Sequence, residues 1–472
     1  MAVIPWIALI IPAALAGISL TLPKASVVRH TPLIAAAALL GCGLLLVVRQ
    51  PDGLTAAGGL LRIDALTAYL LLTVGAVAVV ATGGATTTSA NGRFSALMCL
   101  FLASMTLAVL ADNLGVLWVA IEATTITTAF LVAHGGGRHG LEAAWKYVVL
   151  GSVGVAIAFL GIVLVFAATG EDPTLSWAAL TTRAHLTDSA RIGLALAVLG
   201  LATKAGLAPM HSWLPDAHSQ APAQVSGLMS GVLLSVAFVG ILRLKTISDH
   251  ALGVPLMRTM LSVVGLLSLA VAAALVLTQR NYKRLLAYSS IEHMGILAIG
   301  AAIGGPLATG AVLLHILGHG LAKAGLFVVA GRTLSATGTH AIADVHGLLV
   351  RRPSLGRPWL LGITALLGFP PFGLILTEIA IFVAGYQRGF TVVTSLALLL
   401  LLIVFAGLSR HVLAMTLTRP GTPEDEMGVD PASGGQRLVV LGAFIAVAML
   451  PLLAWPLSSA VQAAVAALGG MP

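Results

Sequence analysis

Apolar runs of ~20 residues follow one another along almost the whole chain, and short polar stretches separate them. Each run is long enough for a helix to cross ~30 Å of hydrocarbon. The pattern therefore predicts an all-α polytopic membrane protein with about 14 transmembrane helices. The predicted spans lie near residues 2–22, 31–48, 63–84, 94–111, 113–133, 144–168, 191–220, 222–245, 254–278, 284–304, 307–331, 356–387, 390–416 and 437–465.

Two of these runs are interrupted by proline and glycine. The first interruption lies in KAGLAPMHSWLPDAHSQAPAQV (Lys204–Val225), and the second lies in LLGFPPFGLILTEIAIFVAG (Leu366–Gly385). Proline removes a backbone donor and clashes with the preceding turn, so each span is expected to break into two shorter helices. Broken membrane helices line enclosed or hydrated cavities, and a matching pair in two halves of a chain is typical of transporters built from repeats.

The composition excludes a large soluble helical bundle. Hydrophobic residues make up 58% and charged residues 9% of the chain, whereas a soluble protein carries roughly 25% charged residues. The first run (Ala2–Leu22) has no basic segment before it and is followed by Pro23 and Lys24, so we expect a spanning helix rather than a removed signal. Cys42 and Cys99 lie in apolar runs without CxxC spacing, so neither a disulfide nor a cofactor is expected.

The net charge of +8 does not indicate nucleic-acid binding, because no basic stretch carries interleaved aromatic residues. Most basic residues occupy short loops, and the loops on one side of the membrane hold the majority of them. The positive-inside rule then places both termini on the outer side of a cell inner membrane. The acidic insert Pro420–Gly435 is expected to be a solvated connector. Two basic residues, Lys204 and Lys323, then remain inside the apolar spans.

Ionisable side chains inside the predicted spans are the strongest indication of function. A charge near the centre of a bilayer costs at least ~2.5–3.5 kcal/mol on insertion scales, so such residues face a protein interior or a water-filled path. Glu122 lies midway along its apolar run, and Lys204 lies just before the first interruption, which also holds His211 and His218. The alternative is structural, because a buried ion pair can simply hold two helices together.

A second group of titratable residues follows in the other half of the chain. His315, His319 and Lys323 are spaced i, i+4 and i+8, which places them along one helix face. A metal site on the HxxxH pair is disfavoured because no third ligand is near it in the sequence. A relay is favoured, since histidine titrates near neutral pH and water can bridge the gaps. The predicted proton pathway, with no catalytic and no metal-binding residue, comprises Glu122, Lys204, His211, His218, Glu292, His293, His315, His319, Lys323 and Glu378.

Several long strings within the chain resemble a known family. They are KAGLAPMHSWLPDAHSQAP, KRLLAYSSIEHMG, HILGHGLAKAGLF, GFPPFGLILTE and LEAAWKYVVLGS, together with Glu122. On these motifs the chain resembles the antiporter-like membrane subunits shared by respiratory complex I, Mrp-type sodium/proton antiporters and energy-converting membrane hydrogenases. The string SSIEHMG makes it most similar to the F-type subunit of hydrogenase-4.

The resemblance implies fourteen helices in two inverted five-helix repeats, with discontinuous seventh and twelfth helices and proton translocation along a central axis. The implied units are residues 1–93 for the first three helices, 94–245 for the first repeat, 254–416 for the second repeat and 437–472 for the last helix. On this correspondence Glu122 matches a glutamate of the fifth helix, and Lys204 matches a lysine of the seventh.

The same correspondence reaches the second repeat and shows two departures. His319 and Lys323 match a pair on the eleventh helix, and Glu378 matches the terminal residue of the path on the twelfth. Many relatives carry a lysine or histidine on the eighth helix, where this chain has Ser235. A glutamate often found near the first break is Gln220 here. Water or another side chain is therefore expected to replace the missing step.

The leading hypothesis is a proton-translocating subunit without an active site of its own. It would work in an inner-membrane complex with other membrane subunits and a peripheral redox module of hydrogenase or complex I type. Glu122 and Lys204 would form a switchable ion pair whose separation frees the lysine proton. Two other classes remain: a subunit of a secondary sodium or proton antiporter or inorganic-carbon uptake system without a redox module, and a scaffold whose charges only hold helices together.

Overall fold

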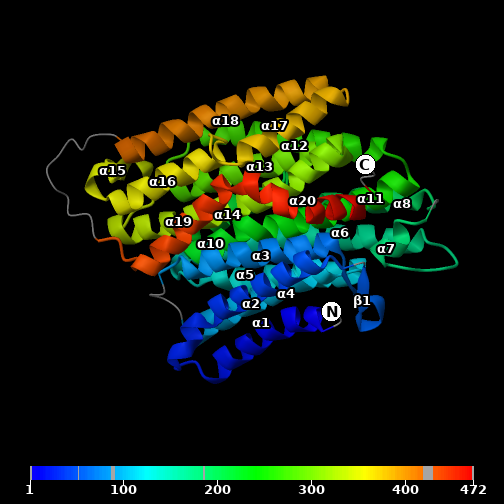
Figure 1. The fold of residues 1–472 in the computed structure, drawn as a ribbon, viewed down its shortest axis with the longest axis horizontal. Helices are drawn as coiled ribbons and strands as arrows, with labels where there is room; N and C mark the ends of the chain where they lie inside the picture. Colours follow the sequence, from blue (N-terminus) through cyan, green and yellow to red (C-terminus); the bar gives the residue numbers. More distant parts are fainter. Residues whose placement is uncertain (1–2, 52, 87–90, 184–185, 418–428, 470–472) are drawn as a thin grey trace.

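The protein is a bundle of helices that lie side by side along one common direction (Figure 1). The structure, a computed structural model, describes residues 3–51, 53–86, 91–183, 186–417 and 429–469. Within these ranges 12 helices are long and apolar enough to cross a membrane, and α17 and α19 are shorter apolar helices. The prediction of a multi-pass, essentially all-helical membrane protein is confirmed. Most of the acidic insert predicted as a connector, residues 418–428, lies outside the described ranges.

The N-terminal part forms helices where the hydropathy pattern predicts spans. It also contains a small antiparallel hairpin, β1 (Leu54–Ala56) paired with β2 (Leu61–Ile63), which the pattern did not predict. The hairpin follows α2, and the isolated pairing of Leu61 with Ala111 attaches it to the end of α4. The helices of this part are α1 (Ile4–Thr21), the short η1 (Ser26–His30), α2 (Thr31–Arg49), η2 (Ala57–Gly59), α3 (Ala65–Gly83) and α4 (Gly92–Leu110).

The middle of the chain contains the first predicted interruption. α8 ends at Lys204 and α9 begins at Trp213, with Gly206 between them at a φ of +71°, which favours glycine. The break at this position is therefore confirmed. α6 begins at residue 137, earlier than the predicted 144. The elements are α5 (Leu114–Ala133), α6 (Gly137–Ala167), α7 (Trp177–Leu180), α8 (Ser189–Lys204), α9 (Trp213–Gln220), α10 (Ala223–Leu228), the π-helical turn η3 (Met229–Leu233) and α11 (Leu234–Ala251).

The C-terminal half contains the second predicted interruption, and this break is also confirmed. α16 ends at Leu366 and α17 begins at Leu374. α1 begins and α20 ends at the same end of the bundle (Figure 1). The elements are α12 (Pro255–Val276), α13 (Tyr282–Ile303), α14 (Gly305–Thr337), η4 (Ile342–Asp344), α15 (Leu348–Arg351), α16 (Pro353–Leu366), α17 (Leu374–Gln387), α18 (Thr391–Leu417), α19 (Gly434–Ala448) and α20 (Leu450–Ala467).

The last predicted span is not one continuous helix, because α19 and α20 meet at a kink at Met449. Pro451 has no N–H, so it cannot bond the carbonyl of Val447 four residues earlier. The backbone N–H of Gly373, at the break between α16 and α17, donates to this carbonyl at 2.9 Å. An N–H group at the second predicted break therefore bonds the carbonyl that the kink in the last span leaves free.

Three basic residues assigned to loops by the sequence are instead helical and buried. Lys283 is 2% exposed, Arg243 is 3% exposed and Arg332 is 2% exposed. Arg243 donates to the carbonyl of Ala111, just past α4, and Arg332 donates to the carbonyl of Gly84, just past α3. These carbonyls follow helix C-termini, where basic side chains satisfy acceptors that the helix leaves free. The sequence count of two buried basic residues was therefore wrong.

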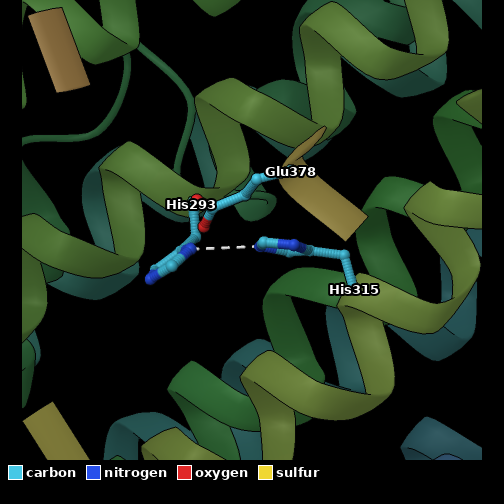
Figure 2. A group of neighbouring side chains, drawn as sticks. All are labelled: His293, His315 and Glu378. Carbon is cyan, nitrogen blue, oxygen red and sulfur yellow. Dashed lines mark hydrogen bonds between the residues drawn. The ribbon is translucent and has the colours of Figure 1, made fainter. Parts of the chain in front are cut away.

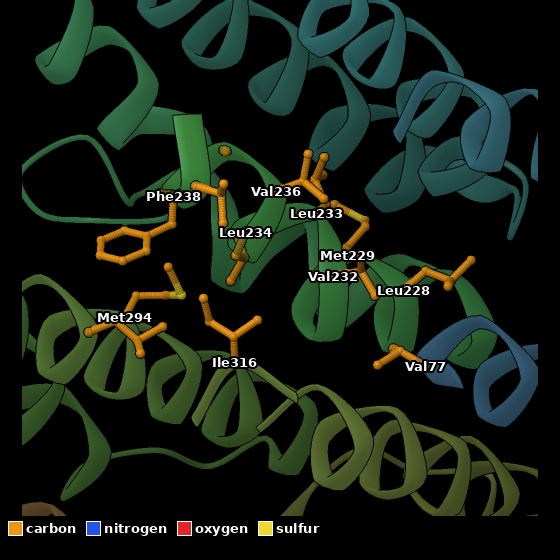
Figure 3. Packing of buried hydrophobic residues seen from close by; sticks show 14 of the residues in the cluster. Val77, Leu228, Met229, Val232, Leu233, Leu234, Val236, Phe238, Met294 and Ile316 are labelled. Atoms are coloured by element: carbon orange, nitrogen blue, oxygen red, sulfur yellow. The ribbon is translucent and has the colours of Figure 1, made fainter. Parts of the chain in front are cut away.

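The segment α10–η3–α11 lies between the two halves of the bundle. α11 packs against α8, and η3 packs against α14. At the second contact a Cβ on Gly231 would lie 2.8 Å from the carbonyl oxygen of Gly320, so both helices need glycine there. Figure 3 shows Met294 of α13 and Ile316 of α14 pointing toward the apolar side chains of α11. This segment connects the surroundings of Lys204 with those of the histidines.

Candidate functional site

Lys204 is completely buried at the end of α8 and is surrounded by aromatic side chains. Its Nζ donates to the Tyr147 hydroxyl at 3.1 Å and lies 4.4 Å from the centre of the same ring. The ring of Trp213, at the start of α9, lies 6.0 Å from Nζ, and its Nε1 donates to the carbonyl of Thr203. The helix break thus brings a second aromatic ring back toward the lysine, and the faces of aromatic rings attract a nearby cation.

Glu122 lies on α5, half-buried, and does not contact Lys204 directly. Ser152 of α6 donates to one carboxylate oxygen at 3.1 Å, and Thr125 donates to the other at 3.2 Å. Among the described residues, the ion pairs within 4.0 Å do not include Glu122 with Lys204. The structure therefore holds the expected pair in a separated arrangement.

A chain of hydroxyl groups connects Lys204 with α5. Beyond its contact with Lys204, the Tyr147 hydroxyl shares a hydrogen bond of 2.6 Å with Thr128, which in turn donates to the carbonyl of Thr125 at 3.3 Å. Tyr147 and Thr128 are both completely buried. Neither residue was predicted from the sequence. The signal that could have found them is the hydroxyl-rich ATTITT within one apolar run and the single tyrosine within the next.

The two histidines of the first interruption have different surroundings. His211 lies half-buried between α8 and α9 and makes no side-chain hydrogen bond to another predicted site residue in the described ranges. His218, on α9, is completely buried and stacks on Phe327 of α14 at 4.9 Å between ring centres. Both of its ring nitrogens lack a hydrogen-bond partner within the described residues. Only His218 therefore reaches the second half of the site.

Lys283 and Lys323 approach the same region from α13 and α14. The Nζ of Lys283 donates to the carbonyl of Ala221 at 2.7 Å, at the end of α9. The Nζ of Lys323 donates to the carbonyl of Leu286 at 2.7 Å and to the hydroxyl of Ser289. Lys283 was missed by the sequence analysis because it stands at the first turn of its span, where loop and helix look alike.

Three histidines form a cluster between α13 and α14. His293 Nδ1 and His315 Nε2 are 3.0 Å apart and share a hydrogen bond, and His315 Nδ1 lies 2.8 Å from the hydroxyl of Thr377 on α17. The rings of His315 and His319 are nearly parallel, with centres 6.3 Å apart, so their predicted common face is confirmed. The ring of His319 also lies 4.8 Å from that of His293. The contact between His293 and His315 was not predicted from the sequence.

Two carboxyl groups lie beside this cluster. Glu292 Oε2 is 3.8 Å from His293 Nε2, and the Glu378 carboxylate points toward the His293 ring (Figure 2). Glu292 and Glu378 both line a cavity of about 260 Å³ that reaches apolar side chains of α18. One donor atom each from His293, His315 and Glu378 lies within 4.8 Å of the others, so these are the described residues that could hold a metal ion.

No side-chain hydrogen bond of the described residues joins the Lys204 group directly to the histidine cluster. The segment between the two groups does carry buried polar atoms that have no protein partner. They are Thr203 Oγ1 on α8, Ser235 Oγ on α11, both ring nitrogens of His218 and both of His319. Buried polar groups of this kind are normally satisfied by ordered water. The arrangement is therefore suited to a hydrated connection between the two groups.

Comparison with known proteins identifies relatives of this arrangement. Residues 111–408 match the family described as NADH:quinone oxidoreductase/Mrp antiporter, transmembrane. The chain is 39% identical over 298 residues to a hydrogenase-4 component F homolog of Methylacidiphilum infernorum, covering 61% of this chain and 62% of that protein. It is 33% identical over 286 residues to an NADH-quinone oxidoreductase subunit N of Desulforudis audaxviator, covering 60% and 56%. The matches thus span less than two thirds of these relatives.

The likeness to a solved structure extends over nearly the whole fold. A chain of respiratory complex I from Thermus thermophilus, solved with bound aureothin, superimposes with a TM-score of 0.81 at 26% identity, covering 98% of this chain and 99% of that one. The similarity to the F-type component of hydrogenase-4, expected from SSIEHMG, is confirmed. The family match covers both Lys204 and the histidine cluster. This chain therefore belongs to the NADH:quinone oxidoreductase/Mrp antiporter membrane family.

Proposed function

We propose that this chain is a proton-translocating membrane subunit of a redox-driven complex of hydrogenase-4 or complex I type. The observation that carries the proposal is the series of buried titratable side chains from Lys204 to Glu378, with unpartnered polar atoms between them. Buried ionisable groups are costly in a membrane, and they are kept where they serve ion pathways. A set of residues that only held helices together would have its polar atoms paired within the protein.

In the proposed route a proton reaches Lys204 from the side of Glu122 and Tyr147. It then passes through water held by the unpartnered Thr203 and Ser235 hydroxyls and by His218. Lys323 and the histidine cluster receive it, and Glu378 is the last group before release. Water-mediated hydrogen bonds are nearly as favourable as direct ones, so side chains that do not touch can still exchange protons.

Electrostatic coupling gives the steps their order. Two unit charges ~4 Å apart interact by about 4 kcal/mol at an effective dielectric constant of 20. Moving one charge through 100 mV of membrane potential costs about 2.3 kcal/mol. Bringing Glu122 up to Lys204, or removing it, therefore changes the energy of the lysine proton by an amount comparable with one pumping step. The separated pair in the structure would be one of the two positions of this switch.

The finer architecture is part of the proposal. We propose fourteen membrane crossings, with inverted repeats at residues 94–245 and 254–416, the first three helices at 1–93 and the last at 437–472. Two breaks at corresponding places support this division, because the breaks after Lys204 and after Leu366 lie at nearly the same distance from the starts of the two repeats. We further propose that both termini face the outer side of an inner membrane and that other membrane subunits and a peripheral redox module are partners.

The test uses the intact complex. It is isolated through an affinity tag on this chain, its other subunits are identified by mass spectrometry, and it is reconstituted into vesicles with a pH-sensitive dye. Lys204→Gln is expected to abolish proton uptake driven by the redox reaction, whereas Lys24→Gln, a change at an exposed position, is expected to leave it intact. Unchanged uptake with Lys204→Gln would remove that residue from the route.

The same preparation separates the remaining functional class. If the isolated complex contains no redox subunit and ion exchange is driven by a sodium gradient alone, the chain is a subunit of a secondary antiporter. Proton uptake that depends on electron transfer and is indifferent to sodium supports the proposal.

A further inference from the structure

His293, His315 and Glu378 converge from three different helices. α13, α14 and α17 contribute one residue each, and their donor atoms lie within 4.8 Å of one another (Figure 2). This set differs from the HxxxH pair that the sequence suggested, because His319 is not among the three. Both histidines are completely buried, and the glutamate lines the cavity beside them.

The spacing of the two histidines fits a common metal ion. Two ligands that each lie ~2.0–2.1 Å from a tetrahedral zinc ion are about 3.3 Å apart. His293 Nδ1 and His315 Nε2 are 3.0 Å apart, so a shift of a few tenths of an ångström opens the required angle. The Glu378 carboxylate already points toward His293 and can close the third position by a side-chain rotation (Figure 2).

The outward nitrogen of His315 has the neighbour that a metal-bound histidine needs. A histidine that binds a metal through one nitrogen donates the other N–H to an acceptor, which fixes its tautomer and orientation. His315 Nδ1 lies 2.8 Å from the hydroxyl of Thr377, which itself donates to the carbonyl of Leu374 at 2.7 Å. His293 Nε2 has no hydrogen-bond partner among the described residues, and the carboxylate of Glu292 lies 3.8 Å from it.

The charge of the surroundings also favours a divalent cation. Glu292 and Glu378 line the same cavity of about 260 Å³, and two carboxylates close together in a buried site repel each other unless a cation or a proton lies between them. A divalent ion would neutralise both carboxylates. Two imidazoles and one carboxylate suit zinc and related transition metals, whereas magnesium and calcium require oxygen ligands throughout.

We propose that His293, His315 and Glu378 form a binding site for a zinc-class divalent metal ion, with the fourth position open to the cavity. Thr377 is the positioning residue of this site. The proposal of a metal site depends only on the geometry of these side chains and not on the proposed function. Its consequence rests on the proposed function: a bound ion occupies the nitrogens that His293 and His315 use to share a proton, and so it blocks the route.

The binding test uses the full chain purified in detergent and titrated with Zn²⁺ by calorimetry, with zinc K-edge absorption to count ligands. We expect one ion bound by two imidazoles and one oxygen ligand. His293→Gln and His315→Gln should each weaken binding by roughly 100-fold or more, and Thr377→Val by about 10–100-fold. His250→Gln, a histidine change at an exposed position near the end of α11, should leave the affinity unchanged.

Two results would overturn the metal site: no Zn²⁺ bound with two imidazoles in the wild-type protein, or equal affinity in the wild-type protein and the His293 and His315 variants. Thr377→Val keeps the shape of the side chain, so it remains informative if a histidine variant fails to fold.

A second measurement separates the site from the proposed function. In vesicles containing the complex, Zn²⁺ should inhibit redox-driven proton uptake, and Thr377→Val should require about 10–100-fold more free Zn²⁺ for the same inhibition. If Zn²⁺ binds through the three residues and uptake continues unchanged, the metal site stands and the route through His293 and His315 is wrong.

Discussion

Lys204 is surrounded by rings and hydroxyl groups, and its only direct side-chain hydrogen bond within the described residues goes to Tyr147. A hydroxyl group can accept a hydrogen bond from the ammonium and donate one to Thr128 at the same time. The tyrosine therefore does two things: its ring stabilises the cation, and its oxygen connects the lysine to α5. These two contributions can be separated by removing the oxygen alone.

Tyr147→Phe keeps the ring under Lys204 and removes the hydroxyl. Hydrogen bonds to charged groups contribute about 1.5–3 kcal/mol, so we expect proton uptake by the complex to fall roughly tenfold or more. The matched control is Tyr69→Phe, because Tyr69 is also completely buried and its hydroxyl donates to a backbone carbonyl, that of Leu313, at 2.8 Å, rather than contacting a titratable side chain. Tyr69→Phe should lose about 1 kcal/mol of stability and Tyr147→Phe about 1.5–3 kcal/mol, because only Tyr147 bonds a charged group. Equal uptake in the two variants would show that the Tyr147 oxygen has no role in transport.

Sequence reasoning identified most of the charged residues of the site but few of their partners. Lys204, Lys323 and Glu378 could be selected because a charge in an apolar run is visible without a fold. Tyr147, Thr128 and the contact of His293 with His315 could not, since they depend on which helix faces which. Lys283 was not predicted for another reason, because a lysine at the first turn of a span has the same local sequence pattern as a lysine in a loop.

At the scale of helices, the positions of the breaks could be predicted from the sequence. The hydrogen-bond partners of the backbone groups at these breaks could not. Pro209 and Pro370 interrupt apolar runs, and proline ends helices for local steric reasons. The bond from Gly373 to the carbonyl of Val447 joins two segments far apart in the chain, so no local pattern contains it. The kink at Met449 was therefore missed, although Pro451 stands in the sequence.

Pro451→Ala tests the connection between these two breaks. Alanine supplies the N–H that Pro451 lacks, so the carbonyl of Val447 can bond within its own helix and release Gly373. The loss of about 1 kcal/mol should make the Gly373 amide exchange hydrogen about fivefold faster. Pro456→Ala, at a proline inside α20, is the control and should leave Gly373 unchanged. Exchange at Gly373 that is the same in both variants would contradict the connection.

At the scale of the whole molecule, the two buried groups belong to different halves and are joined by α9 and by α10–η3–α11. α9 packs against α6 on one side and α13 on the other, and the second segment packs against α8 and α14. Hydropathy predicts that these elements span the membrane, yet it gives no order of neighbours in the bundle. Whether the two groups form one route or two therefore depends on how these helices pack against one another.

A double-variant cycle with Lys204→Gln and Lys323→Gln tests this arrangement. Steps in one route act in series, so the double variant should transport protons no more slowly than the slower single variant. Two independent parallel routes would give a different result, because each single variant would keep the uptake carried by the other route and only the double variant would lose all of it. Redox-driven proton uptake of the reconstituted complex is the measurement, and pairing each change with Lys24→Gln shows the additive behaviour expected of an unrelated site.

The wide turn η3 (Met229–Leu233) has a consequence for comparing distant members of the family. A π-helical turn holds one residue more than the α-helical turns on either side of it. Loss of one residue there can be absorbed by tightening the turn, whereas a loss elsewhere in the same helix rotates everything downstream by about 100°. Gaps in alignments are customarily opened in loops. A homologue that lacks one residue in this turn therefore needs its alignment gap inside the helix, because moving the gap to the loop before α10 would pair the residues of α10 with the wrong partners.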